Sequence, residues 1–372
     1  MNKKIYITQP VLPSKKEVNK IINDLWKSKW LTNKGTYYNS LTNKLSSFFN
    51  ADYISLFANG TLALEIAYNA LELKGEVITT PFTFPATIHS IMRSNLKPVF
   101  CDIKMDDYNI DENLIEKYIT RHTSAICPVH VYGRPCNLKK INEIAKKYNL
   151  KVIYDSAHAF GVKINGKSIT EFGDVNMLSF HATKIFHTFE GGALICKNKN
   201  LYEKFEKLKN FGITNEESVV CVGTNAKLNE FQCGIGLSIL DSIGNEINKR
   251  KKNAEKYIDE LKKIDCLKLP DYNNENITYN YSYFPVLVMQ NKKNITRNDI
   301  YDMLKKDDIL SRKYFYPLCS NYEFYKKLKN ANPSKLPIAN YVADNILCLP
   351  MYGDLKAEQI KLICGKIRKI LV

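Results

Sequence analysis

Short apolar runs alternate with helical patterns from about residue 50 to residue 155, and this alternation limits the chain to few folds. The apolar runs are YISLF, EVITT, KPVF, AICPV and KVIY. Between them, segments such as 60–73 carry apolar residues three or four positions apart, which is the spacing of one helix face. Nearly continuous apolar strands joined by helices predict a mainly parallel sheet that helices cover on both faces.

The second half of the chain follows a different pattern. The strand-like segments 175–180 and 192–197 are too close for a helical crossover, so we expect them to differ in direction or in order. From about residue 198 to 262 the pattern is mostly helical, and the remainder alternates fewer strands and helices. A chain of 372 residues is too long for one ordinary core. We therefore predict a large domain over residues 1–245 and a smaller C-terminal α+β domain over residues 246–372.

Composition and charge disfavour several classes of protein. The sequence is 45% hydrophobic and 25% charged, as in a globular protein. It has neither an apolar run of the roughly 18 residues that a membrane span needs nor a signal-peptide stretch, so we expect a cytoplasmic protein. The ten cysteines contain no C-x-x-C pair, which favours buried thiols over disulfides or zinc. The net charge of +16 is compatible with nucleic acid, but the lysines are dispersed and we expect no such partner.

Several chemically capable residues follow the apolar runs. In open α/β sheets, ligands bind beyond the carboxyl ends of the strands. Gly60 and Thr61 open a helix after YISLF, and a helix N-terminus favours phosphate, although a plain helix cap explains these residues equally well. Phe84 follows EVITT, with a core phenylalanine as the alternative. Asp155 ends a buried strand, where a carboxylate needs a cation. Lys184 follows VNMLSF.

A phosphate cradle, an aromatic ring, a strand-end carboxylate and a strand-end lysine together match what pyridoxal 5′-phosphate requires. Its aldehyde reacts with a lysine amine, its ring nitrogen needs a carboxylate to stay protonated, and its ring packs on an aromatic side chain. A metal site fits less well, because His181 and His187 are six residues apart and nearby acids have no matching spacing. The sequence contains neither the phosphate loop of nucleotide hydrolases nor the glycine pattern of NAD-binding sites after the first strand.

Five segments carry a resemblance to a known family: FANGTLALEIAYNAL, VITTPFTFPATIHSI, VIYDSAHAFG, SFHATKIFHTFEGGALI and GTNAKLNEFQCGIGL. In this order and spacing they resemble the nucleotide-sugar aminotransferases of the DegT/StrS type, and the resemblance runs from about residue 5 to the end of the chain. It implies the aspartate-aminotransferase-like fold (fold type I), with a mainly parallel seven-stranded sheet in the large domain. It also implies pyridoxal 5′-phosphate as the cofactor.

The resemblance assigns roles to single residues. Lys184 is implied to be the Schiff-base lysine and the catalytic residue, and Asp155 the partner of the ring nitrogen. His158 is implied to contact the phenolic oxygen of the cofactor. The remaining cofactor contacts are implied for Phe84 on the ring and, at the phosphate, for Gly60, Thr61, Ser179 and the neighbouring subunit's Asn225. The family is therefore expected to form homodimers with shared active sites. Relatives with histidine at the lysine position act as dehydratases, so Lys184 favours transamination.

Other segments resemble one branch of that family. LPSKKEV, WLTNKG, TKIFHTFEGG and SRKYFYPL look like transaminases that aminate dTDP-4-keto-6-deoxyglucose at C4, with L-glutamate as the donor. The implied product is dTDP-4-amino-4,6-dideoxyglucose (dTDP-viosamine), used for surface polysaccharides such as O-antigen. The substrate-binding residues implied here are His181, Glu190, Arg312, Lys313 and Tyr314. An ordinary strand end in the small domain is the alternative for the last three, and His187 is expected to be structural or exposed.

Three other functions stay open at this point. A C3 aminotransferase, or one that uses a UDP-sugar, would need the same cofactor residues. A catalytically silent relative that acts as a regulator is disfavoured, because Lys184, Asp155 and Ser179 are all present. A basic nucleic-acid-binding protein is disfavoured because the sequence contains no recognised nucleic-acid module.

Overall fold

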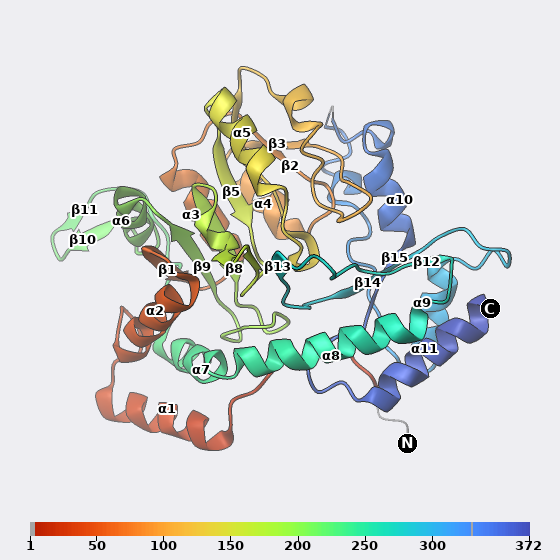
Figure 1. The fold of residues 1–372 in the computed structure, drawn as a ribbon. Coiled ribbons are helices and arrows are strands. Elements are labelled where there is room, and N and C mark those ends of the chain that lie inside the picture. Colours follow the sequence, from red (N-terminus) through yellow and green to blue (C-terminus); the bar gives the residue numbers. More distant parts are fainter. Residues whose placement is uncertain (1–3, 329) are drawn as a thin grey trace.

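A seven-stranded sheet forms the centre of the computed structural model, which describes residues 4–328 and 330–372 (Figure 1). The strand order is β1-β9-β8-β5-β4-β2-β3. The strands span Tyr53–Phe57 (β1), Glu76–Thr79 (β2), Lys97–Phe100 (β3), Thr123–Cys127 (β4), Lys151–Asp155 (β5), Val175–Ser179 (β8) and Gly192–Cys196 (β9). Strands β2, β3, β4, β5 and β8 run parallel, whereas β9 is antiparallel to both of its neighbours. The predicted mainly parallel sheet is confirmed.

The loop between β8 and β9 contains Lys184. Because this loop is too short for a helical crossover, β9 returns antiparallel to β8, with Ser179 opposite Gly192. The expectation that these two strands differ in direction is therefore confirmed. A Cβ atom at position 192 would lie 2.8 Å from backbone atoms of Asn59 and Gly60. The turn that follows β1 thus packs directly on the start of β9.

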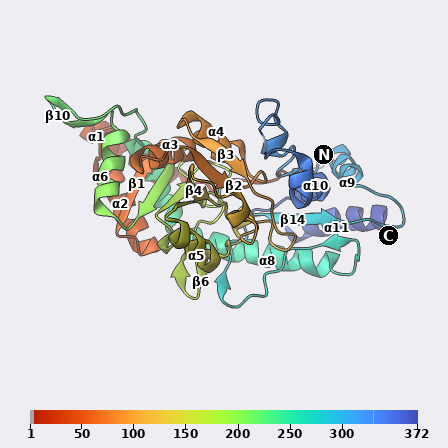
Figure 2. The same cartoon turned by 90° about the horizontal axis from the view of Figure 1, so that it is seen from above.

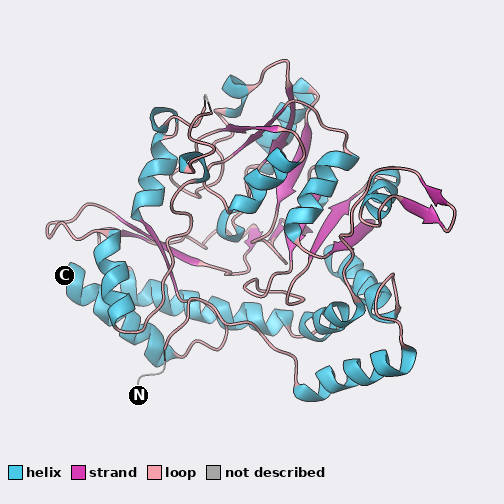
Figure 3. Cartoon of the chain, turned by 180° about the vertical axis from the view of Figure 1, so that it is seen from behind, coloured by secondary structure: helices cyan, strands magenta, loops and turns pink. Residues whose placement is uncertain are grey.

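Helices cover both faces of the central sheet, as Figures 2 and 3 show. On one face, α3, α4 and α6 share a core with Ile153 and Met177. On the other face, α2, α5 and α7 pack with Tyr154 and Leu178. Neighbouring residues of a strand point to opposite faces, which explains this division. The helices span Lys15–Ser28 (α1), Thr36–Phe49 (α2), Gly60–Ala70 (α3), Pro85–Arg93 (α4), Leu138–Tyr148 (α5), Lys199–Leu208 (α6) and Glu230–Leu240 (α7).

A second, three-stranded antiparallel sheet lies beside the long helix α8 (Figure 1). Ile5, near the N-terminus, packs into the core of this part of the chain. The elements are α8 (Ile243–Leu261), β12 (Leu267–Lys268), β14 (Phe284–Val288), α9 (Arg297–Lys306), α10 (Pro337–Asn345), β15 (Ile346–Leu349) and α11 (Ala357–Leu371). The predicted domain boundary between residues 245 and 246 falls within α8, and it stays a prediction.

A short hairpin interrupts the segment that the sequence pattern predicted to be mostly helical. Its strands are β10 (Ile213–Asn215) and β11 (Ser218–Val219), and Figure 1 shows that it projects from the body of the protein. Val219 is 68% exposed, and Val222 just beyond the hairpin is 96% exposed. Two such short strands cannot bury an apolar face of their own. A further small sheet contains β6 (Lys163–Ile164), β7 (Lys167–Ser168) and β13 (Ile277–Thr278).

The cysteines and the helices can be compared with the expectations from composition. All ten cysteines are free thiols, and most of them are buried. They pack as small apolar groups, which is the behaviour expected of reduced cysteine in strand-like segments.

None of the helices in the described part of the chain is long and apolar enough to cross a membrane. Residues 1–3 of the N-terminal stretch lie outside the described residues.

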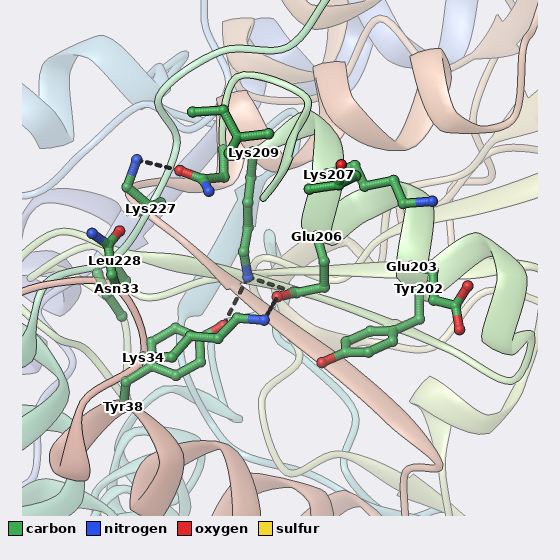
Figure 4. A pocket seen from close by; sticks show the side chains of 13 residues that line it. Asn33, Lys34, Tyr38, Tyr202, Glu203, Glu206, Lys207, Lys209, Lys227 and Leu228 are labelled. Carbon is green, nitrogen blue, oxygen red and sulfur yellow. Dashed lines mark hydrogen bonds and ion pairs between the residues drawn. The ribbon is translucent and has the colours of Figure 1, made fainter. Parts of the chain in front are cut away.

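A buried lysine donates a hydrogen bond to a backbone carbonyl on the unpaired side of β1. Lys209 is 2% exposed, and its Nζ donates to the carbonyl oxygen of Leu56 at 3.3 Å, to the hydroxyl of Tyr38 at 2.7 Å and to the carboxylate of Glu206. Figure 4 shows the contacts of Lys209 with Tyr38 and Glu206, and the pairing of Lys34 with Glu206. These residues line a cavity of about 550 Å³. An edge strand otherwise presents unpaired backbone groups. Because β1 leads into the turn before α3, the network also fixes that turn.

Replacing Lys209 with methionine is expected to lower the free energy of unfolding by about 3–5 kcal/mol, because the mostly buried carboxylate of Glu206 keeps the more exposed Lys34 as its one cation among the described residues, besides the hydroxyl of Ser55. Burial alone would raise the pKa of Glu206, but the two lysines bring that pKa below its ordinary value. The stabilisation is therefore complete above the pKa of the unfolded carboxyl, about 4.3. It is lost as the pH falls through the lower pKa of the folded state.

Urea titration of the full-length variants at neutral and acidic pH measures this effect. The matched control is Lys34→Met, because the Lys34 side chain is 53% exposed and pairs of that kind contribute about 1 kcal/mol or less. Equal losses in the two variants would show that Lys209 has no special place in the network.

Candidate active site

The turn between β1 and α3 has the form of an anion-binding site. Asn59 caps α3, and its side-chain oxygen accepts a hydrogen bond from the amide of Leu62 at 2.9 Å. The amides of Gly60 and Thr61 have no partner within the helix, because a helix leaves its first N–H groups free. These two amides and the positive end of the helix dipole can together hold a phosphate.

Ser179 lies beside this turn at the end of β8. A Cβ atom at Gly60 would lie 3.5 Å from the Cβ of Ser179 and 2.9 Å from the sulfur of Met177. Any larger residue at position 60 would therefore crowd β8, and glycine allows the backbone to approach the serine. The structure thus brings together Gly60, Thr61 and Ser179, the residues for which the resemblance implied phosphate contacts within one subunit.

Asp155 ends β5 and is 5% exposed. The hydroxyl of Thr87 donates to Oδ2 at 2.7 Å, and the amide of Ala157 donates to Oδ1 at 3.1 Å. Burial raises the pKa of the carboxyl, while these hydrogen bonds and the charge of Lys184 oppose the rise. A carboxylate in this position is strongly stabilised by a positive N–H group beside it.

Lys184 lies in the loop after β8, in a turn where its amide donates to the carbonyl of His181 at 2.8 Å. Its side chain is half-buried, and Nζ donates to the hydroxyl of Tyr283 at 3.3 Å. Burial lowers the pKa of the amine, and the negative charge of Asp155 opposes this shift. The lowered pKa increases the fraction of neutral amine, which is the nucleophilic and basic form.

His158 lies three residues beyond the carboxyl end of β5 and is 4% exposed. The backbone amide of Tyr132 donates to its Nδ1 at 3.3 Å, so the proton of a neutral ring is on Nε2. Burial lowers the pKa of His158 well below its ordinary value, and the charge of Lys184 adds to this shift. The ring stacks on Phe315 with 5.7 Å between the ring centres. His158 is therefore a neutral donor through Nε2.

Two predicted cofactor residues are exposed in the single chain. Phe84 caps α4 and is 57% exposed, so the alternative of an ordinary core phenylalanine is wrong. Asn225 is exposed beside the turn before α3, where the amide of Ala58 donates to the carbonyl of Ala226 at 2.8 Å. Both side chains remain accessible to a ligand or to a second subunit.

The two histidines near Lys184 have different surroundings. His181 Nδ1 is 2.7 Å from the hydroxyl of Thr183, and its Nε2 is 3.5 Å from a carboxylate oxygen of Glu190. His187 is buried, and its Nε2 is 2.9 Å from the carbonyl oxygen of Val11. His187 thus has the structural surroundings expected of it. No group of three His, Cys, Asp or Glu side chains within residues 4–328 and 330–372 could hold a metal ion.

The side chains of residues 312–314 point in two different directions. The guanidinium of Arg312 lies 5.6 Å from the ring centre of Tyr314, whose ring is 5.9 Å from that of Tyr283. Tyr314 therefore lies beside the tyrosine that contacts Lys184, and Arg312 lies against Tyr314. Lys313 instead meets α9, where its Nζ donates to the side chain of Asn298 at 2.6 Å and lies 4.4 Å from the Tyr301 ring centre.

Three residues at the site were not singled out from the sequence. Thr87 donates to Asp155, and its place one helical turn after the Thr83 hydroxyl was a weak signal in the sequence. Tyr132 fixes the tautomer of His158 through its backbone, which no side-chain pattern can reveal. Tyr283 immediately precedes β14 of the second sheet, and nothing in the sequence links it to a loop of the first.

Comparisons with known proteins agree with this site. A model of the DegT/DnrJ/EryC1/StrS aminotransferase family matches residues 13–368. The dTDP-4-amino-4,6-dideoxy-D-glucose transaminase of Shigella dysenteriae is 42% identical over 370 residues, which are 100% of both chains. A transaminase of the same name from Escherichia coli is 45% identical over 371 residues, with 98% of this chain and 100% of the relative covered. The crystal structure of DesI with its TDP-sugar product has a TM-score of 0.94 and 28% identity, and covers 100% of this chain and 94% of that one.

The described residues fit pyridoxal 5′-phosphate. The free amides at the start of α3 can bind its phosphate, and the buried carboxylate of Asp155 can pair with its protonated ring nitrogen. A fold of this type with a lysine and an aspartate at its strand ends is that of an enzyme acting on amines through this cofactor. The chain belongs to the DegT/DnrJ/EryC1/StrS aminotransferase family. It is an aminotransferase that depends on pyridoxal 5′-phosphate, and the predictions of family, fold type and cofactor are confirmed.

Proposed function

We propose that this protein transfers the amino group of L-glutamate to the C4 keto group of dTDP-4-keto-6-deoxy-D-glucose. The product is dTDP-4-amino-4,6-dideoxyglucose, a precursor for surface polysaccharides such as O-antigen. The observation that carries the reaction type is the placement of Lys184, Asp155 and His158 at one edge of the sheet. Full-length similarity to two transaminases named for this product supports the choice of substrate.

Each cofactor residue has a defined task in this reaction. Pyridoxal 5′-phosphate supplies an aldehyde that joins amines and a ring that withdraws electrons from the neighbouring carbon. Asp155 keeps a proton on the ring nitrogen, because its buried carboxylate is stabilised by that positive N–H group. His158 would donate from Nε2 to the phenolic oxygen, because its Nδ1 already accepts from the amide of Tyr132. Phe84 would pack on the ring, and Gly60, Thr61 and Ser179 would bind the phosphate.

Lys184 carries the cofactor between turnovers and moves protons during them. With glutamate joined to the cofactor in its place, the free Nζ of Lys184 would accept the proton from the α-carbon of the amino acid and would deliver it to the cofactor carbon that carried the aldehyde. Only the neutral amine can accept that proton. Burial lowers the pKa of Lys184 and so increases the fraction of the amine that is neutral.

The substrate side of the site is proposed to contain positive and polar groups. Arg312 and Tyr314 lie together near Tyr283, and a guanidinium is suited to the diphosphate of a nucleotide sugar. His181 and Glu190 are exposed on the loop of Lys184, where they can contact the sugar. Lys313 extends the positive charge toward α9.

The active form is proposed to be a homodimer in the cytoplasm. Asn225 is exposed beside the phosphate-binding turn of its own chain and reaches the cofactor phosphate of the partner in this arrangement. Apolar side chains with exposed fractions between 41% and 96% gather in the same region: Phe211, Ile213, Val219, Val220 and Val222. Burial against a second copy would remove them from water. The free thiols suit a reducing compartment.

Incubation with L-glutamate and a panel of keto-sugars tests the proposed reaction. We expect the holoenzyme to lose its yellow colour when glutamate is added and to form an amine only at C4 of dTDP-4-keto-6-deoxyglucose. Proton and carbon NMR of the product locate the new amino group. Amination at C3, or a higher kcat/KM with a UDP-sugar, would replace the proposed substrate by one of its two alternatives. No bleaching with any amino donor would contradict transamination itself.

In the proposed dimer each active site contains residues of both chains, and this sharing can be measured. A variant with Asn225→Ala is expected to bind the cofactor more weakly, because one phosphate contact is lost from each site. Mixing it with Lys184→Ala is expected to form heterodimers in which one site has both changes and the other has neither, so part of the activity returns. Analytical ultracentrifugation checks the assembly. A monomeric enzyme with full activity would contradict the shared site.

A further inference from the structure

The amine of Lys184 donates a hydrogen bond to a hydroxyl from the segment just before β14. Its Nζ donates to Oη of Tyr283 at 3.3 Å, the one side-chain hydrogen bond found for this amine among the described residues. The same nitrogen is 5.9 Å from the centre of the tyrosine ring. Nζ is thus much nearer to the hydroxyl than to the ring, so the contact is a hydrogen bond rather than a cation over an aromatic face.

Tyr283 is held firmly in this position. Its carbonyl oxygen accepts a hydrogen bond from the hydroxyl of Tyr272 at 3.1 Å. Its ring meets the ring of His158 nearly edge-on at 4.9 Å, and the rings of Tyr132 and Tyr314 lie 5.6 and 5.9 Å away. Aromatic contacts on several sides leave the ring few alternative positions. The hydroxyl therefore has a defined place relative to the cofactor-binding edge of the first sheet.

A tyrosine hydroxyl can serve Lys184 in both of its protonation states. Burial raises the pKa of Tyr283 above its ordinary value of about 10, so the phenol keeps its proton at neutral pH. A protonated phenol accepts a hydrogen bond from an ammonium and donates one to a neutral amine. A carboxylate in the same place would only accept, and it would hold the lysine in its charged and inactive form.

We infer that Tyr283 is a positioning residue that holds the free amine of Lys184, through its hydroxyl, whenever this amine is not joined to the cofactor. The inference rests on the proposed role of Lys184 as the group that leaves the cofactor and moves protons. The free lysine has four rotatable side-chain bonds and would otherwise sample many positions. A fixed partner keeps Nζ within reach of the reacting carbon.

The test removes the hydroxyl and keeps the ring, in Tyr283→Phe. The full-length chain without cofactor is treated with cyanate, which carbamylates neutral amines, over a range of pH, and modification of Lys184 is quantified by peptide mass spectrometry. We expect the pH at which carbamylation of Lys184 is half-maximal (the midpoint) to fall by about one unit. The reason is that a hydrogen bond to an ammonium is stronger than one between neutral groups. The rate of bleaching by saturating glutamate should fall about 100-fold, with little change in KM.

Two further variants make the result specific. Tyr281→Phe is the matched control, because it removes a hydroxyl from the same segment that has no hydrogen bond to Lys184 among the described residues; both readouts should stay at the wild-type values. Incorporation of 3-fluorotyrosine at position 283 keeps the packing of the ring and weakens the oxygen as an acceptor. This variant should lower the midpoint by a smaller amount than Tyr283→Phe. It also tests the inference if the phenylalanine variant does not fold.

A wild-type midpoint and a wild-type bleaching rate in Tyr283→Phe would overturn the positioning role. A slower rate with an unchanged midpoint would also overturn it, because a purely structural loss would explain that pattern. Failure of the proposed function has a different signature, namely turnover in Lys184→Ala. The two ideas can therefore fail independently.

Discussion

Replacing Lys184 with alanine is expected to reduce kcat for amino transfer by at least about 10⁴-fold. The change removes both the covalent attachment of the cofactor and the group that moves the proton, and proton transfer by a positioned side chain alone contributes about 10²–10⁴-fold. The variant should still bind pyridoxal 5′-phosphate through the turn before α3, but without the absorption band that attachment to lysine produces. Steady-state kinetics and absorption spectra of the purified protein measure both effects.

The control for this experiment is Lys197→Ala, which removes an exposed lysine just beyond β9. It should retain wild-type kcat and the wild-type spectrum. Measurable turnover in Lys184→Ala at more than a trace level would exclude this lysine as the catalytic amine. Reduction of the holoenzyme with borohydride, followed by peptide mapping, should place the label on Lys184 and would expose any other attachment site.

Replacing Asp155 with asparagine is expected to leave the cofactor bound but to lower kcat by about 10³-fold, the scale of losing one strong electrostatic interaction in a buried site. An amide has the size of the carboxylate and can still accept from the amide of Ala157. It carries no negative charge, so the cofactor nitrogen loses its proton and the ring withdraws electrons poorly. Rapid mixing with glutamate separates this chemical step from binding.

Asp174→Asn is the matched control for that change, because Asp174 pairs with Lys151 at the opposite end of β5, and its side chain is 33% exposed. It should have little effect on either half of the reaction. If Asp155→Asn proceeds at nearly the wild-type rate, another group must control the protonation of the ring nitrogen, and the role given to Asp155 is wrong.

The sequence predicted the central sheet and its two main chemical residues for a simple reason. Asp155 and Lys184 each follow an apolar run, and the carboxyl ends of parallel strands form the ligand-binding edge of such sheets. The same logic pointed to Gly60 and Thr61 as candidates for phosphate contacts, with a plain helix cap as the alternative. The role of His158 needed the resemblance to a family, because a histidine three residues beyond a strand has no distinctive local pattern.

Contacts between distant segments could not be predicted in the same way. Tyr283 reaches Lys184 from the segment that leads into β14, and the amide that selects the tautomer of His158 belongs to a turn elsewhere in the chain. The hairpin at 213–219 was missed because its apolar residues are too few and too irregular to give a strand period. Lys313 lay within a promising motif, but alternate residues of an extended segment point in opposite directions, which separates it from Arg312 and Tyr314.

The position of β1 at the edge of the sheet has a consequence for biosynthesis. Within the seven-stranded sheet, β1 pairs with β9, which leaves the ribosome only after most of the large sheet has been made, and Lys209 closes its other edge later still. A nascent chain that stops before β9 therefore exposes β1 on both sides, and such edges favour aggregation. The turn between β1 and α3, which we propose binds the cofactor phosphate, can be completed only when that late segment arrives, so the ability to bind the cofactor should appear abruptly during synthesis.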